Sequence, residues 1–138
     1  MEIARKVLLT WRKRYEDSLK NGLMPLTKIY LGHLMNHFNT FGVIGLPEAA
    51  ANFMRNPQLW LEPSEKEVEE AVSIMRKMVS LIRSRAEEYE TRDGFLYNVE
   101  EIPGESTAYR LAMLDYAKFK KRVKSGDVFI PGDGSIFF

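Results

Sequence analysis

The residues best suited to chemistry lie between Ile102 and Arg110, where a predicted strand ends, a glycine-containing turn follows and a helix begins. Ser106 and Thr107 bring two hydroxyl groups to the start of that helix. The first amide groups of a helix have no partner within it and carry partial positive charge, so this arrangement suits a phosphate group. Arg110 would add further donors. The alternative interpretation is that Ser106 or Thr107 simply caps the helix.

Two histidines form the second candidate site. His33 and His37 are four residues apart, a spacing that would place both imidazoles on one side of a helix. A useful metal site needs a third and usually a fourth ligand, and no acidic residue lies at a compatible spacing nearby. The ligand count therefore favours a structural role for both histidines, and we expect no metal ion here.

The composition excludes several classes of function. The chain has 138 residues, 45% hydrophobic and 28% charged, which is typical of a single folded unit spanning 1–138. A net charge of +1 argues against binding to nucleic acid or to a membrane surface. Without cysteine, the chain has no disulfide, thiol nucleophile or cysteine-bound zinc. Because the N-terminus has no signal-peptide pattern, we expect a cytoplasmic protein.

Hydrophobic periodicity predicts a helix-dominated α/β chain with long amphipathic helices and a few short strands. Ser64 and Glu67 match a capping box at the start of the longest helix. The expected helices are 2–21, 47–54, 64–91 and 106–123, the expected strands are 41–46, 95–102 and 128–130, and residues 26–40 are ambiguous between helix and loop.

Two helices carry informative apolar faces. In the first, the cations Arg5 and Arg12 lie mostly off one apolar stripe with three- and four-residue spacing. The stripe consists of Ala4, Val7, Leu8, Trp11, Tyr15 and Leu19. In the longest helix, Ile74 and Leu81 widen the apolar stripe. The wide stripe indicates that other elements pack against this helix on more than one side. The apolar segment 136–138 is typical of a strand edge that needs a neighbour.

Three segments, taken in order, resemble the anaerobic, glycyl-radical ribonucleoside-triphosphate reductases. Residues 22–53 (GLMPLTKIYLGHLMNHFNTFGVIGLPEAAANF) and 94–115 (GFLYNVEEIPGESTAYRLAMLD) are similar to family segments in order and approximate spacing. Residues 126–132 (GDVFIPG) are similar to the segment just before the family's Tyr-Thr-Asn-Ser motif. Within these segments Gly104 stands where the family usually has alanine and Ser106 where it usually has glycine. His33 has no counterpart, whereas His37 matches.

The resemblance implies an internal segment of a ten-stranded α/β barrel that reduces ribonucleoside triphosphates to their 2'-deoxy forms. The family's finger-loop cysteine, zinc site and radical glycine are missing from this chain, so we expect the isolated chain to be inactive and to hold no cofactor. In the family, zinc, the glycyl radical and the ATP/dATP effectors lie elsewhere. The resemblance implies two partners, the remainder of the reductase chain or a homologous subunit, and a nucleoside triphosphate. Its phosphates would be held by Gly104, Glu105, Ser106, Thr107, Ala108 and Arg110.

Two alternatives remain open at this point. The chain is either a scaffold segment of the reductase, or a small non-catalytic protein derived from that barrel. In the second case it would act through helix-mediated association with a partner, or as a nucleotide-binding module that has lost its chemistry.

Overall fold

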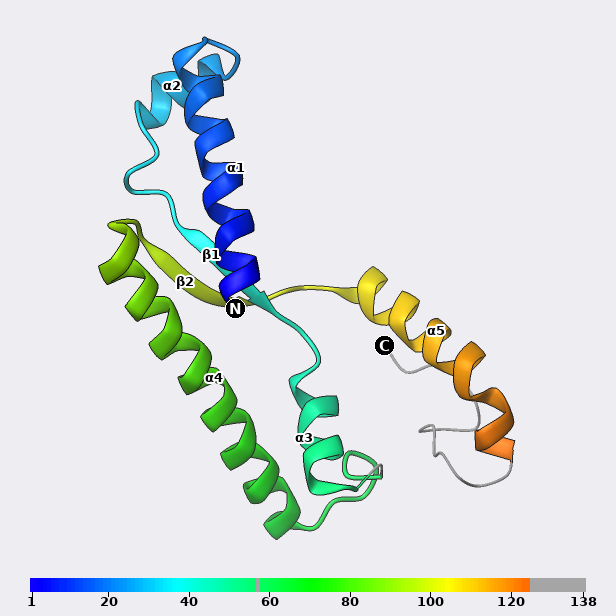
Figure 1. The fold of residues 1–138 in the computed structure, drawn as a ribbon. Coiled ribbons are helices and arrows are strands. Elements are labelled where there is room, and N and C mark those ends of the chain that lie inside the picture. The colour runs from blue at the N-terminus through cyan, green and yellow to red at the C-terminus, as the bar shows by residue number, and fades with distance from the viewer. Residues whose placement is uncertain (57, 125–138) are drawn as a thin grey trace. The chain divides into compact units, whose positions relative to one another are not determined.

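The structure, a computed structural model, describes residues 1–56 and 58–124 (Figure 1). The chain divides into two compact units. The first contains residues 1–43 and 78–101, the second contains residues 44–77 and the chain from Ile102 onward, and α4 contributes to both. In chain order the elements are α1 (Glu2–Lys20), α2 (Pro25–Leu31), β1 (Asn39–Val43), α3 (Leu46–Met54), α4 (Glu65–Asp93), β2 (Tyr97–Glu101) and α5 (Glu105–Lys124).

The long helices and both described strands agree with the periodicity of the sequence, and the differences fall at their ends. The ambiguous segment 26–40 forms the short helix α2 followed by a loop. β1 begins two residues earlier than expected, and Gly45, with φ of +83°, then leads into α3. Such a φ suits glycine because it has no Cβ. The expected strand 128–130 and the apolar segment 136–138 lie outside the described residues.

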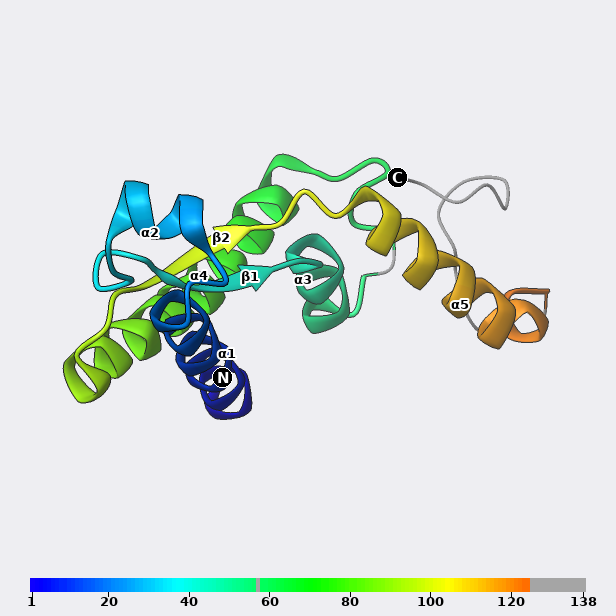
Figure 2. The same ribbon diagram turned by 90° about the horizontal axis from the view of Figure 1, so that it is seen from above.

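The first unit is built around a parallel pair of strands. β1 and β2 pair in register from Asn39 opposite Tyr97 to Val43 opposite Glu101, and both views show them side by side (Figure 2). Phe41, Tyr97 and Val99 share one face of this pair because side chains alternate along a strand. That face packs against three residues of the flanking helices, Leu8 of α1 and Ala86 and Tyr89 of α4.

The buried face of α1 contains only part of the apolar stripe that the sequence predicts: Leu19 is buried and Leu8 packs against the core. Val7, Trp11 and Tyr15 are 47–49% exposed, whereas Arg12 is only 5% exposed and the Arg5 side chain only 13%. Both arginines find oxygen partners in other segments of the unit, and these partners make their burial tolerable. The helix is therefore rotated away from the orientation that its hydrophobic pattern favours.

The second unit has a separate small core. Ala50 of α3, Leu59 of the following loop and Ala71 of α4 are fully buried together. The capping box is confirmed: Glu67 accepts hydrogen bonds from the amide and hydroxyl of Ser64 at 2.9 and 2.7 Å. The Ser64 hydroxyl lies 3.4 Å from the Glu67 amide that donates to it, so the start of α4 is fixed on both sides.

The expected cover on a second side of α4 is not found in the part of the chain that the structure describes. Leu81 is 64% exposed, although Ile74 is partly buried. Among the described residues, no helix combines the length and apolar character needed to span a bilayer.

Candidate functional site

The turn between β2 and α5 has the strand–turn–helix order expected for it. β2 ends at Glu101 and α5 begins at Glu105. The Gly104 carbonyl accepts a hydrogen bond of 2.7 Å from the Ala108 amide, which makes Gly104 the residue that precedes the helix. The three amides of residues 105–107 therefore lack a carbonyl partner one turn earlier in the helix. These amides, on an exposed surface, are the groups that a phosphate would meet.

The structure corrects the capping hypothesis for this turn. Ser106 and Thr107 lie inside the helix rather than before it, and neither hydroxyl makes a hydrogen bond to another described residue. Both hydroxyls are thus available at the helix start. Glu105 is also in the first turn, where its carboxylate already complements the positive end of the helix. A bound phosphate would have to displace this side chain toward solvent.

Gly104 has a close side-chain neighbour, the flexible end of Ile44. A Cβ atom at this position would lie 2.6 Å from Cδ1 of Ile44. The alanine that is usual in the family at this position therefore needs a different placement of the Ile44 side chain. The pair of Gly104 and Ile44 accounts for one of the two departures in this segment.

Arg110 lies one turn further along α5 than the amides of the helix start. It is exposed, as are Ser106 and Thr107. Side chains on a helix lean toward its N-terminus, so a long side chain at this position can reach back toward the free amides. The predicted residues of the turn are thus brought together at one helix start, with Arg110 at its margin.

The two histidines are not brought onto one side of a helix. α2 ends at Leu31, and Gly32, with φ of +67°, turns the chain away from the helix, so His33 and His37 do not share a helical face. Nδ1 of His33 accepts a hydrogen bond from the Met35 amide at 3.3 Å. Among the described residues, no three side chains of His, Asp or Glu gather closely enough to hold a metal ion.

A buried polar cluster in the first unit is the feature that the sequence does not reveal. Asp93, at the end of α4, accepts hydrogen bonds from Nε of Arg5 at 2.6 Å and from the Tyr97 hydroxyl at 2.7 Å, and Nη2 of Arg5 bonds its second oxygen. The Arg5 guanidinium, followed by the Tyr97 hydroxyl, holds the pKa of the Asp93 carboxyl below its usual range. Burial, with the neighbouring carboxylate, raises the pKa of the Tyr97 hydroxyl.

Arg12 forms a second buried connection in the same unit. Its guanidinium donates to the carbonyls of Leu34 and His37, with a distance of 2.9 Å to His37. The guanidinium carbon also lies 4.1 Å from the centre of the Phe95 ring. α1 is thereby fixed to the loop after α2. Arg5 and Arg12 are separated by 22 or more residues from these partners, and no local spacing points to them.

These features define a helix-dominated α/β segment that holds a parallel strand pair and an exposed strand–turn–helix junction. The family model of the anaerobic ribonucleoside-triphosphate reductases matches residues 1–131, nearly the whole chain. The chain belongs to this family. No curated protein and no solved structure shows significant similarity to it.

Proposed function

We propose that this chain forms part of the catalytic barrel of an anaerobic ribonucleoside-triphosphate reductase, which reduces ribonucleoside triphosphates to 2'-deoxyribonucleotides. It contributes scaffold, and residues 103–108 help to orient the substrate's phosphates. The remainder of the reductase chain or a homologous subunit supplies the thiol and radical groups. The observation that carries the proposal is the incomplete parallel sheet of the first unit.

Two parallel strands are a small part of a stable sheet. Parallel sheets are ordinarily covered on both faces and contain more strands than two. Here one face is packed, whereas the other carries Thr40, Gly42, Asn98 and Glu100 and is mainly exposed. Among the described residues, β1 and β2 pair only with each other. Each strand therefore keeps an edge on which a further strand can pair, as the wall of a larger barrel requires.

The surface of α1 and α2 also supports a role as part of a larger body. Besides Trp11 and Tyr15 on α1, α2 exposes its apolar side chains, from 51% for Leu31 to 82% for Tyr30. So many exposed large apolar side chains on two short segments are unusual on a free monomer and indicate a contact surface. The same surface fits the alternative of a non-catalytic interaction protein, so the experiment must distinguish the two.

Hydrogen exchange tests the scaffold role. The chain is measured alone and after mixing with a polypeptide that carries the flanking parts of a full-length family member. We expect the outward amides of β1 and β2 to exchange rapidly in the chain alone and to become protected in the mixture, because new strands pair with them. Amides of α3 serve as the internal control. Protection of both strand edges in a monomeric isolated chain would contradict the scaffold role and favour the independent protein.

Substrate-phosphate binding has its own prediction. Calorimetry of the chain with ATP and CTP is expected to show binding, and Arg110→Ala is expected to weaken it about tenfold, because a charged donor to phosphate is lost. Arg76→Ala, an exposed arginine on α4, is the matched control and should leave the affinity unchanged. If the unmodified chain shows no heat of binding with either nucleotide, the proposed phosphate role is wrong, whereas the proposed scaffold role is unaffected.

A further inference from the structure

We propose that a groove in the first unit, between the start of α1 and the C-terminal half of α4, binds an amphiphilic anion. The ligand class is a carboxylate or phosphate carried on a short apolar body. This inference does not depend on the proposed function, because no residue of the β2–α5 turn takes part in it.

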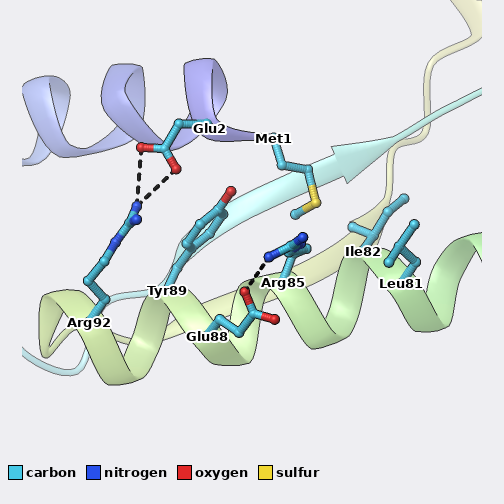
Figure 3. A pocket seen from close by; sticks show the side chains of 8 residues that line it. All are labelled: Met1, Glu2, Leu81, Ile82, Arg85, Glu88, Tyr89 and Arg92. Atoms are coloured by element: carbon cyan, nitrogen blue, oxygen red, sulfur yellow. Dashed lines mark hydrogen bonds and ion pairs between the residues drawn. The ribbon is translucent and has the colours of Figure 1, made fainter.

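The groove has a polar part and an apolar part (Figure 3). Its volume is about 600 Å³, within the range of small-molecule sites. Leu81, Arg85, Tyr89 and Arg92 recur at spacings of three and four along α4 and so line it from one helical face. The remaining lining residues are Met1, Glu2, Ile82 and Glu88. Leu81 and Ile82 lie at one end and Arg92 with Glu2 at the other.

Tyr89 supplies the first polar contact for a ligand. The residue is only 6% exposed, and its ring packs against Phe41 and Tyr97 at centroid distances of 6.0 and 5.9 Å. Its hydroxyl nevertheless makes no hydrogen bond to any described residue, whereas the Tyr97 hydroxyl is bonded to Asp93. In Figure 3 the Tyr89 hydroxyl points toward the start of α1, on the groove side. The ring is buried, but the hydroxyl oxygen itself is not fully buried, so on this side it can meet water or an acceptor on a ligand.

The two arginines of the groove make the ligand an anion. Arg85 donates to Glu88 through Nη1 at 2.6 Å, and Arg92 donates to Glu2 through Nη2 at 2.9 and 3.1 Å. A guanidinium has five N–H donors, so each retains donors beyond these bonds. All four side chains are 46–58% exposed, and ion pairs at such exposure are weak enough for a ligand to replace. Glu2 and Glu88 also line the groove and balance the two positive charges, so an anionic head would bind by replacing one of these carboxylates at a guanidinium.

The apolar end of the groove selects the body of the ligand. Leu81 is 64% exposed and adjoins Ile82 and the Met1 side chain, so an alkyl group placed there would remove apolar surface from water. An elongated ligand can thus cover Leu81 while its anionic head meets Arg85 and the Tyr89 hydroxyl. Inorganic phosphate alone would satisfy only the polar half.

Titration calorimetry of the full chain with octanoate and with octyl phosphate tests the inference. We expect at least one of these anions to bind, and the tighter of the two identifies the head group. Arg85→Gln should weaken binding about tenfold and Tyr89→Phe severalfold, since each removes a hydrogen bond to the charged head. Octanol and octyltrimethylammonium, which have the same body but no anionic head, should bind much more weakly.

The control variant is Arg83→Gln, which removes a cation from the same helix outside the groove. Arg83 is 76% exposed, is paired with Glu87 and is not among the lining residues. It should leave the affinity unchanged. The inference is overturned if neither anion binds at millimolar concentration, if octanol or the ammonium compound binds equally well, or if Arg83→Gln weakens binding as much as Arg85→Gln. Arg85 is half exposed, so this comparison stands even where Tyr89→Phe disturbs folding.

Discussion

Replacing Asp93 with alanine is expected to lower the free energy of unfolding of the first unit by about 3 kcal/mol. The Asp93 side chain is only 6% exposed and joins the start of α1 to the start of β2 by accepting from Arg5 and Tyr97. Without the carboxylate, the Tyr97 phenol and the Nε and Nη2 groups of Arg5 lose their acceptor in a largely buried place, and Arg5 keeps only its bond from Nη1 to Glu2 at 2.8 Å. The cost of such unpaired groups adds to the value of the lost bonds. The urea concentration at which the first unit unfolds should fall. Hydrogen exchange of the amides in β1 and β2, followed at increasing urea concentration, measures this midpoint.

Glu88→Ala is the matched control for this prediction. Glu88 also pairs with an arginine on α4, but both partners of that pair are more than half exposed. Solvent screens such a pair, so the midpoint should stay within error of the unmodified chain. Equal effects of the two substitutions would show that the Asp93 cluster does not hold the unit together.

The pH dependence gives an independent measurement of the same cluster. Arg5 and Tyr97 lower the pKa of Asp93 below its ordinary value of 3.8 in the folded state. A group with a lowered folded pKa stabilises the fold fully above its unfolded pKa and loses that contribution as the pH falls toward the folded pKa. The difference in stability between the unmodified chain and Asp93→Ala should therefore be largest above about pH 5 and shrink steadily below about pH 4. A difference that is constant down to pH 2 would contradict the charged-carboxylate explanation.

The elements of the fold could be predicted from local pattern because their signals are local. The capping box at Ser64 and Glu67 and the strand alternation around Tyr97 both depend on residues a few positions apart. The prediction was only partly right for α1: Leu8 and Leu19 of the stripe face the core, but Arg12 is buried as well, and hydrophobic periodicity assigns arginine to the solvent side of a helix. Arg12 can be buried here because its guanidinium donates hydrogen bonds to two carbonyl groups that lie more than 20 residues away in the sequence. No pattern within α1 contains that information.

The same distinction applies to the candidate sites. The β2–α5 turn could be located from the sequence, since a strand, a glycine turn and a helix start follow one another directly. The groove beside Tyr89 could not, because it needs α1 and α4 to meet in space. The periodicity of α4 indicates only that Tyr89 lies on an apolar stripe. That its hydroxyl has no partner among the described residues depends on the packing around it.

Arg12→Met is the second substitution for which we expect a large effect, again a loss of about 3 kcal/mol in the free energy of unfolding of the first unit. Methionine keeps much of the apolar volume over Phe95, so the loss reports mainly the charged hydrogen bonds to Leu34 and His37, with a smaller part from the 3.4 Å ion pair of Arg12 with Glu16. Both carbonyls would lose their charged donor, and the loop after α2 would lose the hydrogen bonds that the structure describes between it and a side chain of α1. Hydrogen exchange in residues 32–38 should therefore accelerate more than exchange in β2.

Arg14→Met provides the comparison, because Arg14 lies on the exposed side of the same helix with its guanidinium 5.1 Å from the Trp11 ring centre. Arg14→Met removes the same charge and causes the same change in helix propensity as Arg12→Met. Arg14, however, makes no hydrogen bond to the loop after α2. We expect it to shift the midpoint little. If Arg14→Met destabilised the unit as much as Arg12→Met, the loss would come from helix charge or propensity, and the rotated burial of α1 would not be what holds the loop in place.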